Sequence, residues 1–569
     1  MATTSSSAHP KGLWVLFGTE MWERFNFYGM RALLTLFMVN SLGFLESDSS
    51  IFYGGFLALC YLTPMLGGFI SDKYLGNRNC IMIGGTLMGI GQLFLFFSAS
   101  IFSSNLDLAK SLMWLALLVI IFGNGFFKPN ISSMVGSLYP KSEKTKLDTA
   151  FTIFYMGINL GAFLGQFICP VVGDVKVNGL QDPFAFKWGF LAAAMAMFIG
   201  TLVFFFLKNK YVISPEGRPI GGLPKHNTND DFEVGESQSA QFKSSSILMA
   251  FGIFTVLLFV FRQLLVGEIG FSNFEMSQLV KGIIYPFIYS AGISLAVLIV
   301  SDSSITKIER QRIFVIYIVS FFIIFFWAAF EQAGSSLTFI ASNQTDRHIF
   351  GWEMPASMVQ IFNGLFVVIM AVPFSMLWDK LRAMDKEPVS PFKQALGLFL
   401  IAISYFIIAN NVKDLGTGML AVKWLILLYL IQTCGELCLS PIGLSLVGKL
   451  APKRFASLLY GVFFIANAAG YALAGSLGAI MPPTGDKFQK AQELGVNLQD
   501  VLDEKVQLTP DQIKLFADNQ LLTHYPSFAG VTIHNLYEFF MVFVVLCGIA
   551  GTLLALLSPT LKKMMNGVR

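Results

Sequence analysis

Charged side chains are scarce in this sequence: Asp, Glu, Lys and Arg together make up 13% of its 569 residues. Soluble domains carry about 25% charged residues, so this composition excludes an ordinary soluble protein. Hydrophobic residues instead account for 54% of the chain, and 58 residues are Phe. We therefore expect most of the surface to lie in a lipid bilayer. The small net charge of +4 is spread over many short loops, which argues against a nucleic-acid partner.

Cysteine and histidine are also few. The six cysteines lie in or beside apolar runs without the spacing of a disulfide framework or a zinc site, so we expect free thiols and no metal site. None of the five histidines lies deep in an apolar run, which argues against a histidine proton relay. No HExxH or GxSxG motif occurs, so the sequence does not indicate an enzyme. No obligate protein partner is evident either.

Long apolar stretches dominate what is present. A membrane-spanning helix needs about 20 mostly apolar residues. The sequence contains fourteen such stretches and so predicts an all-α integral membrane protein with fourteen transmembrane helices. Their approximate bounds are 13–42, 50–72, 80–103, 110–138, 148–170, 186–208, 246–266, 278–301, 311–341, 355–378, 392–411, 419–448, 454–480 and 534–558.

The loops between these stretches predict the topology. Lys and Arg concentrate in alternate loops, which fall on one side if the N-terminus is cytoplasmic. Both termini are then expected in the cytoplasm, with the chain in the inner membrane. We expect an N-terminal six-helix bundle at 1–208, a cytoplasmic linker at 209–245 and an inserted transmembrane helix pair at 246–301. A C-terminal six-helix bundle is expected at 302–569, with an extracytoplasmic insertion at 481–530.

The first apolar stretch contains four ionisable residues, Glu20, Glu23, Arg24 and Arg31. Such side chains are costly inside a membrane and usually functional. At about 100° per residue, all four fall within an arc of roughly 100°. This stripe predicts a helix face turned toward a protein interior or a water-filled cavity. A structural ion-pair network is the alternative.

Three further charged residues lie deep in other apolar stretches: Lys128, Glu331 and Glu436. Each alone could be a satisfied structural charge. Together with the stripe on the first stretch, they predict one central site that holds both cations and anions. Such a site suits a zwitterion, because Arg and Lys bind its carboxylate and Glu binds its amine.

A glycine pattern surrounds Asn159. Gly157, Gly161 and Gly165 recur every four residues, which predicts close approach of a neighbouring helix. Asn159 itself is either an interhelical hydrogen-bonding residue or a substrate ligand, and the pattern alone leaves both open.

Several motifs at these positions resemble one family. The segment 20–29, EMWERFNFYG, resembles the first-helix motif ExxERFxYYG of the proton-dependent oligopeptide transporters, a branch of the major facilitator superfamily. The segments 127–130, FKPN, and 154–161, FYMGINLG, resemble that family's signatures around helices four and five. The segment 68–78, GFISDKYLGNR, resembles the superfamily's loop between helices two and three.

The resemblance implies the major facilitator fold, with two six-helix bundles and one inserted helical pair. It implies that protons are coupled to alternating access by Glu20, Glu23, Arg24, Lys128 and Glu331. Protons would be the coupling ion, with no other cofactor.

The resemblance also implies a peptide site. Arg31 and Lys128 would hold the peptide carboxylate, and Asn159, Asn363 and Glu436 would hold its amino terminus. The cavity would be lined by Tyr28, Tyr61, Trp327 and Ser440. One departure concerns the second helix, where Gly54 stands at the position of a His shared by animal members.

These observations predict proton-coupled symport of di- and tripeptides, with peptide-like drugs as further substrates. One alternative is a symporter of the same fold for nitrate, amino acids or another small anion. Another is a nutrient sensor that binds without transporting. Glu436 favours peptides, because an anion carrier has no need of a carboxylate that binds an amine.

Overall fold

The computed structural model describes residues 9–139, 144–214, 217–223, 242–267, 275–439 and 443–568. Two compact units contain these residues. The first unit comprises Met1–Leu42, Leu59–Thr228 and Pro355–Gly364. The second comprises Gly43–Ala58, Asn229–Met354 and Leu365–Arg569. One helix, α2 (Glu46–Ile70), therefore has its first half in the second unit and its second half in the first.

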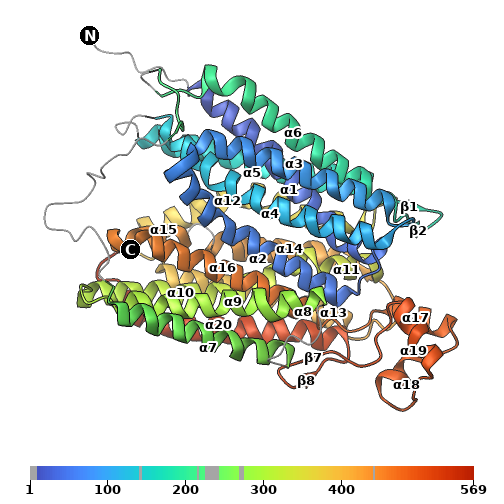
Figure 1. Cartoon of the computed structure of the whole chain (residues 1–569). Helices are drawn as coiled ribbons and strands as arrows, with labels where there is room; N and C mark the ends of the chain where they lie inside the picture. Colours follow the sequence, from blue (N-terminus) through green and yellow to red (C-terminus); the bar gives the residue numbers. More distant parts are fainter. Residues whose placement is uncertain are drawn as a thin grey trace, which may run out of the picture. The chain divides into compact units, whose positions relative to one another are not determined.

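The first unit consists of long helices that follow one another along the chain (Figure 1). α1 packs against α5 and α6, and α3 packs against α4 and α6. Besides the second half of α2, its elements are α1 (Lys11–Asn40), η1 (Ser71–Leu75), α3 (Gly76–Ile101), α4 (Leu106–Ser137), α5 (Lys144–Gly173), β1 (Lys176–Val177), β2 (Leu180–Gln181), α6 (Phe186–Tyr211) and η4 (Ala356–Gln360). β1 and β2 form a short antiparallel hairpin between α5 and α6.

The second unit contains the remaining helices and six short strands. Its helices are α7 (Ser244–Val266), α8 (Met276–Leu279), η2 (Val280–Ile284), α9 (Tyr285–Val300), α10 (Lys307–Phe330), η3 (Glu331–Gly334), α11 (Ser336–Asn343), most of α12 (Ile361–Ala383), α13 (Ser390–Val412), α14 (Val422–Leu439), α15 (Gly443–Leu450), η5 (Lys453–Phe455), α16 (Ala456–Gly478), α17 (Gly485–Glu493), α18 (Leu498–Leu502), α19 (Pro510–Asp518) and α20 (Leu536–Met564). Its strands are β3 (Thr345–Asp346), β4 (His348–Ile349), β5 (Trp352–Glu353), β6 (Leu420–Ala421), β7 (Ser527–Phe528) and β8 (Val531–Thr532). β3 pairs with β6 in parallel, whereas β4–β5 and β7–β8 are antiparallel hairpins.

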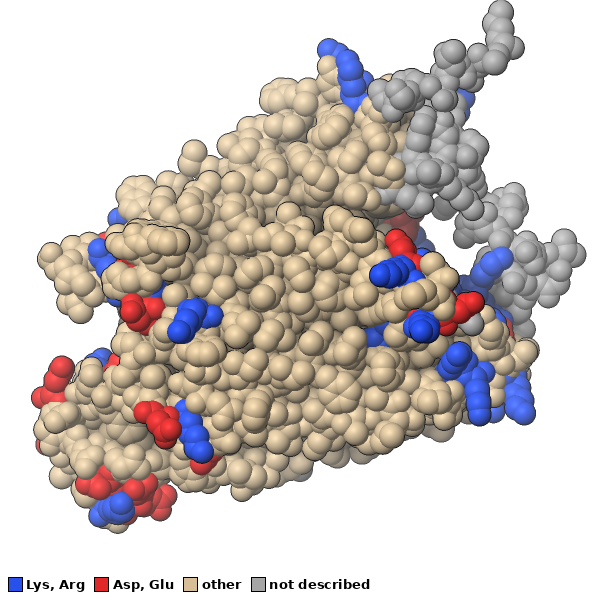
Figure 2. All heavy atoms as spheres, turned by 180° about the vertical axis from the view of Figure 1, so that it is seen from behind, with Lys and Arg blue, Asp and Glu red and all other residues tan. Residues whose placement is uncertain are grey.

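Each of the fourteen predicted spans lies largely on helix, and residues 440–442 of the span 419–448 lie outside the described residues. Twelve helical stretches of the described residues are long and apolar enough to cross a membrane. One of them, Glu46–Ile101, is 56 residues long and contains both α2 and α3, enough for two crossings. α1 adds a helix of 30 residues whose charges keep it out of that set. On the face drawn in Figure 2, most of the surface is uncharged and charged side chains are few.

The predicted glycine stripe on α5 is confirmed as a packing surface, and its partner is α1. A Cβ added at Gly161 would overlap the Met21 carbonyl oxygen, and one at Gly165 would overlap that of Phe25. A Cβ at Gly157 would lie 2.9 Å from the Phe17 ring. Two helix backbones approach this closely only where one of them lacks side chains. The glycines therefore pack α5 against the face of α1 that carries Phe17, Met21 and Phe25.

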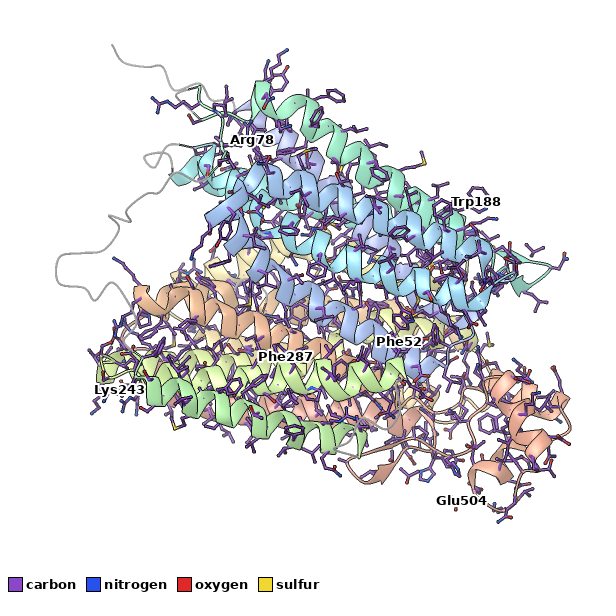
Figure 3. All side chains as sticks on the ribbon, viewed as in Figure 1. Phe52, Arg78, Trp188, Lys243, Phe287 and Glu504 are labelled. Atoms are coloured by element: carbon purple, nitrogen blue, oxygen red, sulfur yellow. The ribbon has the colours of Figure 1, made fainter. Side chains whose placement is uncertain are left out.

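Arg78, from the motif at 68–78, anchors the end of α6. Its guanidinium donates to the Asn209 side chain at 2.8 Å and to the Lys208 carbonyl at 3.1 Å. It also donates to the carbonyls of Val212 and Ile220. The side chain lies at the start of α3, as Figure 3 shows. This motif residue is thus a structural clamp between α3 and the segment that follows α6.

The segment 481–530 folds into a small helical subdomain of the second unit. Helices α17, α18 and α19 enclose a core of their own, separate from the long helices. Its buried residues are Ala491, Leu498, Val501, Leu502, Phe516 and Leu521. The insertion is therefore a packed body rather than an extended loop.

Candidate functional site

The charged stripe of α1 forms a buried acid–base cluster. Arg24 Nε lies 2.7 Å from Glu20 Oε1, one helical turn away, and 3.0 Å from Glu23 Oε2. The two glutamates are at most 1% exposed, and Arg24 is 6% exposed. No described residue donates a hydrogen bond to either oxygen of Glu23 or to Glu20 Oε2. Two buried carboxylates thus share one guanidinium, and the cluster keeps a net negative charge unless a proton or a second cation compensates it.

Lys128 supplies a second cation beside this cluster. It extends from α4, and its electrostatic partners are Arg24, Glu23, Glu20 and Tyr28. Its Nζ lies 4.2 Å from the centroid of the Tyr61 ring, which belongs to the second half of α2. An aromatic face attracts a cation at this distance. α1 and α4 therefore bring two carboxylates and two cations together, and the second half of α2 adds an aromatic ring beside Lys128.

Arg31 lies two turns further along α1 than Arg24. It is 8% exposed, and its guanidinium carbon lies 5.4 Å from the centroid of the Tyr28 ring. Both predicted carboxylate-binding cations, Arg31 and Lys128, thus rest on an aromatic ring. An aromatic ring attracts a cation without carrying a full counter-charge.

Asn159 forms no hydrogen bond to another helix among the described residues. Its side-chain amide donates to the Tyr155 carbonyl at 3.0 Å, one turn earlier on α5. Of the two alternatives left open by the sequence, the structure gives no support to an interhelical bond. Asn363 lies at the start of α12, within the short segment that packs with the first unit. That segment is tied to the end of α5, because Ser357 donates to Asp174 Oδ2 at 2.8 Å through both its backbone N–H and its hydroxyl.

The remaining predicted residues belong to the second unit. Trp327, near the end of α10, packs against Phe330 with ring centroids 5.4 Å apart and against Tyr471 with centroids 5.9 Å apart. Glu331 is 2% exposed and stands where α10 passes into the tighter turn η3. Glu436 is half-buried on α14. Ser440 lies outside the described residues.

One buried cation of the inserted pair was not singled out by the sequence analysis. Arg262 on α7 is 2% exposed and donates to the Gly282 carbonyl at 3.1 Å. The rule that singled out α1, that an ionisable group inside an apolar span is costly, applies equally to this residue. Its bond joins α7 to η2 and so closes the inserted pair on itself.

Gly54, the departure noted in the sequence, leaves no room for a larger residue. A Cβ there would lie 2.7 Å from the Gly475 Cα and 2.7 Å from the Tyr471 carbonyl oxygen, both in the backbone of α16. The missing imidazole is therefore replaced by direct helix packing. Among the described residues, no group of three or more His, Cys, Asp or Glu side chains could hold a metal ion. The acidic groups beside Arg24 are the carboxylates of Glu20 and Glu23.

Comparison with solved structures confirms the predicted fold. A structure of the peptide transporter POT in complex with sulfate superposes with a TM-score of 0.72 at 27% sequence identity. The match covers 99% of this chain and 97% of that one. The chain is therefore an all-α membrane protein with the major facilitator fold.

Sequence comparison identifies the family. A family model described as the POT family matches residues 78–221 and 234–493. The chain is 31% identical over 492 residues to the uncharacterized transporter YclF of Bacillus subtilis (strain 168), covering 86% of this chain and 90% of that protein. It is 30% identical over 479 residues to the peptide transporter YePEPT of Yersinia enterocolitica subsp. palearctica serotype O:3 (strain YE-P4), covering 83% and 88%. The chain thus belongs to the POT family of membrane transporters.

Proposed function

We propose that this chain is a proton-coupled symporter that moves di- and tripeptides into the cell by alternating access. Its similarity to proteins named as di-/tripeptide transporters from Lactococcus lactis and as a peptide transporter from Yersinia supports this function. The observation that carries the coupling is the arrangement of Glu20 and Glu23 around the single guanidinium of Arg24. Such a cluster changes its net charge by one when it takes up a proton.

The cluster provides a coupling mechanism. While both glutamates are ionised, they attract Arg24 and Lys128. Protonation of one carboxylate removes an attraction that is strong in a low-dielectric interior. Lys128 is then more available to an incoming carboxylate, so proton and peptide bind cooperatively. Glu331, buried in the second unit, would be the second proton carrier.

The peptide ends would be held by groups of opposite charge. Arg31 and Lys128 would bind the peptide carboxylate, each supported by the aromatic ring beneath it. Asn159, Asn363 and Glu436 would bind the peptide amine. Tyr28, Tyr61, Trp327 and Ser440 would line the remaining cavity, which would also admit peptide-like drugs. Protons would be the only coupling ion, and no cofactor would be required.

The proposed topology follows the positive loops. Both termini would lie in the cytoplasm, with the chain in the inner membrane and the 481–530 subdomain on the opposite side. In this orientation the inward proton gradient drives uptake, because a membrane potential adds about 2.3 kcal/mol per charge for each 100 mV.

The test is uptake of a labelled dipeptide by proteoliposomes under an imposed proton gradient. Concentrative uptake that collapses with a protonophore is expected. Uptake that ignores the gradient would disprove the coupling. Competition by unlabelled dipeptide, but not by nitrate or a single amino acid, would separate peptide symport from the anion alternative. Binding without flux would identify a sensor instead.

A further inference from the structure

The first half of α2 packs with the second unit although it follows directly on α1. Its residues 46–58 lie among the C-terminal helices, and the division between the units falls between Ala58 and Leu59. Figure 3 shows Phe52 on this half of the helix. A helix shared by two units must change its contacts if the units move apart.

The contact between α2 and α16 is tight. A Cβ at Gly475 would lie 2.9 Å from the Ser50 carbonyl oxygen, and one at Gly478 would lie 3.0 Å from the Ser50 side chain. Gly54 faces Gly475 across the same contact. Ser50 is fully buried there. Because small residues on both helices form this contact, it can separate without tearing apart interlocked side chains.

The acidic first turn of α2 is held by the 481–530 subdomain. Glu46 Oε1 accepts a hydrogen bond from Asn343 Nδ2 at 2.8 Å and lies 3.4 Å from Lys487 Nζ on α17. The side chains of Lys487 and Glu46 are 14% and 17% exposed. Burial acts to lower the pKa of Lys487, but Glu46 and Asp486 outweigh it and raise that pKa. Lys487 therefore stays charged and paired.

Hydrogen bonds at the start of α17 fix the position of the helix that carries Lys487. The backbone N–H of Gly485, at the start of α17, donates to the Gln344 side chain at 3.1 Å. The Gln344 amide in turn donates to the carbonyls of Gly416, at 2.6 Å, and Gly418, at 3.2 Å. α17 is also part of the subdomain's apolar core, through the buried Ala491. The outer part of the subdomain is marked by Glu504 in Figure 3.

The inserted helix pair holds the same turn of α2 from another side. Asp48 and Lys281 interact electrostatically and together line a pocket of about 250 Å³. One turn further on, the Tyr285 hydroxyl donates to the Ile51 carbonyl at 2.8 Å. A Cβ at Gly55 would lie 2.7 Å from the Val280 side chain. The first three turns of α2 thus follow the inserted pair closely.

We propose that Lys487 of the subdomain and Lys281 of the inserted pair form an electrostatic latch on Glu46 and Asp48, the acidic first turn of α2. The latch holds the first half of α2 with the second unit and must open before α2 can move as one body with the other N-terminal helices. This proposal rests on the proposed function, because alternating access requires that movement. It assigns a positioning role in transport to two segments outside the twelve core helices.

Opening of the contact between α2 and α16 can be measured without any substrate. Ser50→Cys places a thiol in the buried contact between α2 and α16, and a membrane-impermeant maleimide added to intact cells reports how often that contact opens. The chain without this substitution gives the background from its own cysteines. We expect Lys487→Ala to speed labelling about 1.5- to 5-fold, the range expected for one partly exposed ion pair. Lys281→Ala should also speed labelling, and in the double variant the two fold-increases in labelling rate should multiply.

A matched control lies in the same subdomain. Lys505 pairs with Asp503 at 2.9 Å, and its electrostatic partners Asp503, Asp500 and Tyr525 all belong to the subdomain, so Lys505→Ala should leave the labelling rate unchanged. Combining Glu46→Lys with Lys487→Glu reverses the pair and should restore slow labelling, which a merely unfolded subdomain would not do. Unchanged labelling in Lys487→Ala, or no recovery in the reversed pair, would overturn the latch.

The transport readout is separate. In dipeptide uptake, Lys487→Ala should lower the apparent KM by a similar factor, because more of the protein would face the entry side. Absence of dipeptide uptake by the unmodified chain would disprove the proposed function and leave the labelling result standing. Labelling that does not respond to Lys487→Ala, alongside normal uptake, would disprove the latch alone.

Discussion

The ammonium nitrogen of Lys128 lies 4.2 Å from the centre of the Tyr61 ring, so α4 and the second half of α2 meet at a cation–aromatic contact. The sequence does not predict this contact, because the two residues belong to different apolar stretches. The contact holds Lys128 beside the buried glutamates of α1 without neutralising its charge. In the proposed mechanism it presents this cation to both the proton carriers and the peptide.

Removing the ring should weaken peptide binding. Tyr61→Ala is expected to raise the KM for a dipeptide about 2- to 30-fold, the factor that corresponds to a partly desolvated cation–aromatic contact. Tyr61→Phe keeps the ring and should stay close to the unmodified value. Equal losses in both variants would show that the hydroxyl, rather than the ring, matters. The measurement is initial uptake rate against dipeptide concentration.

Neutralising a proposed proton carrier should abolish driven uptake but leave exchange intact. Glu20→Gln or Glu331→Gln removes a proton carrier, so accumulation under a proton gradient should be lost while counterflow exchange persists. Glu353→Gln, which alters an ion pair to Arg347 outside the cluster, is the control and should transport normally. Normal accumulation in both test variants would reject these residues as proton carriers.

The glycine stripe of α5 should tolerate no side chain. Gly161→Ala introduces a methyl group that overlaps the backbone of α1 at Met21 and should destabilise the protein by about 1–3 kcal/mol. Gly548→Ala on α20, where a Cβ meets nothing within 4 Å, should be neutral or slightly stabilising. Thermal unfolding in detergent compares the two. Equal stability of both variants would contradict the packing assigned to α5.

One carboxylate outside the membrane-spanning helices should show a defined pH dependence. Arg382, with help from Lys393, lowers the pKa of Glu387 from 4.5 to about 2. Because the folded-state pKa is the lower one, the stabilisation is fully present above pH 4.5 and is lost as pH falls toward 2. Because Glu387 is partly exposed, its ion pairs should add about 0.2–1 kcal/mol to the free energy of unfolding. The thermal unfolding temperature of Glu387→Gln should therefore fall below that of the unmodified chain at pH 7.

The difference between these two proteins should shrink steadily on acidification below pH 4.5. Asp379→Asn, which alters only an exposed contact of Arg382 at 3.3 Å, serves as the control and should show little difference at either pH. A gap between Glu387→Gln and the unmodified chain that stays constant with pH would rule out an ionic origin.

The local pattern of residues was enough to find the helices and one face of the site. Apolar runs of about 20 residues predict spanning helices whatever surrounds them, because an unsatisfied backbone is too costly in lipid. The charges of α1 share one stripe by helical periodicity, so Glu20, Glu23, Arg24 and Arg31 could be grouped from their spacing alone. Gly157, Gly161 and Gly165 could be recognised as a packing stripe in the same way, although not its partner.

What the sequence determined by itself was which side chains point the same way on each helix, since that depends only on spacing along one chain segment. Only the tertiary structure decided which helices meet: α5 with Met21 of α1, Lys128 with Tyr61, and Lys487 with Glu46. These pairings join residues far apart in the chain, and packing of whole helices selects them. One helix face could pack against many others, and the partner it has is the one that fits the close packing of all neighbouring helices.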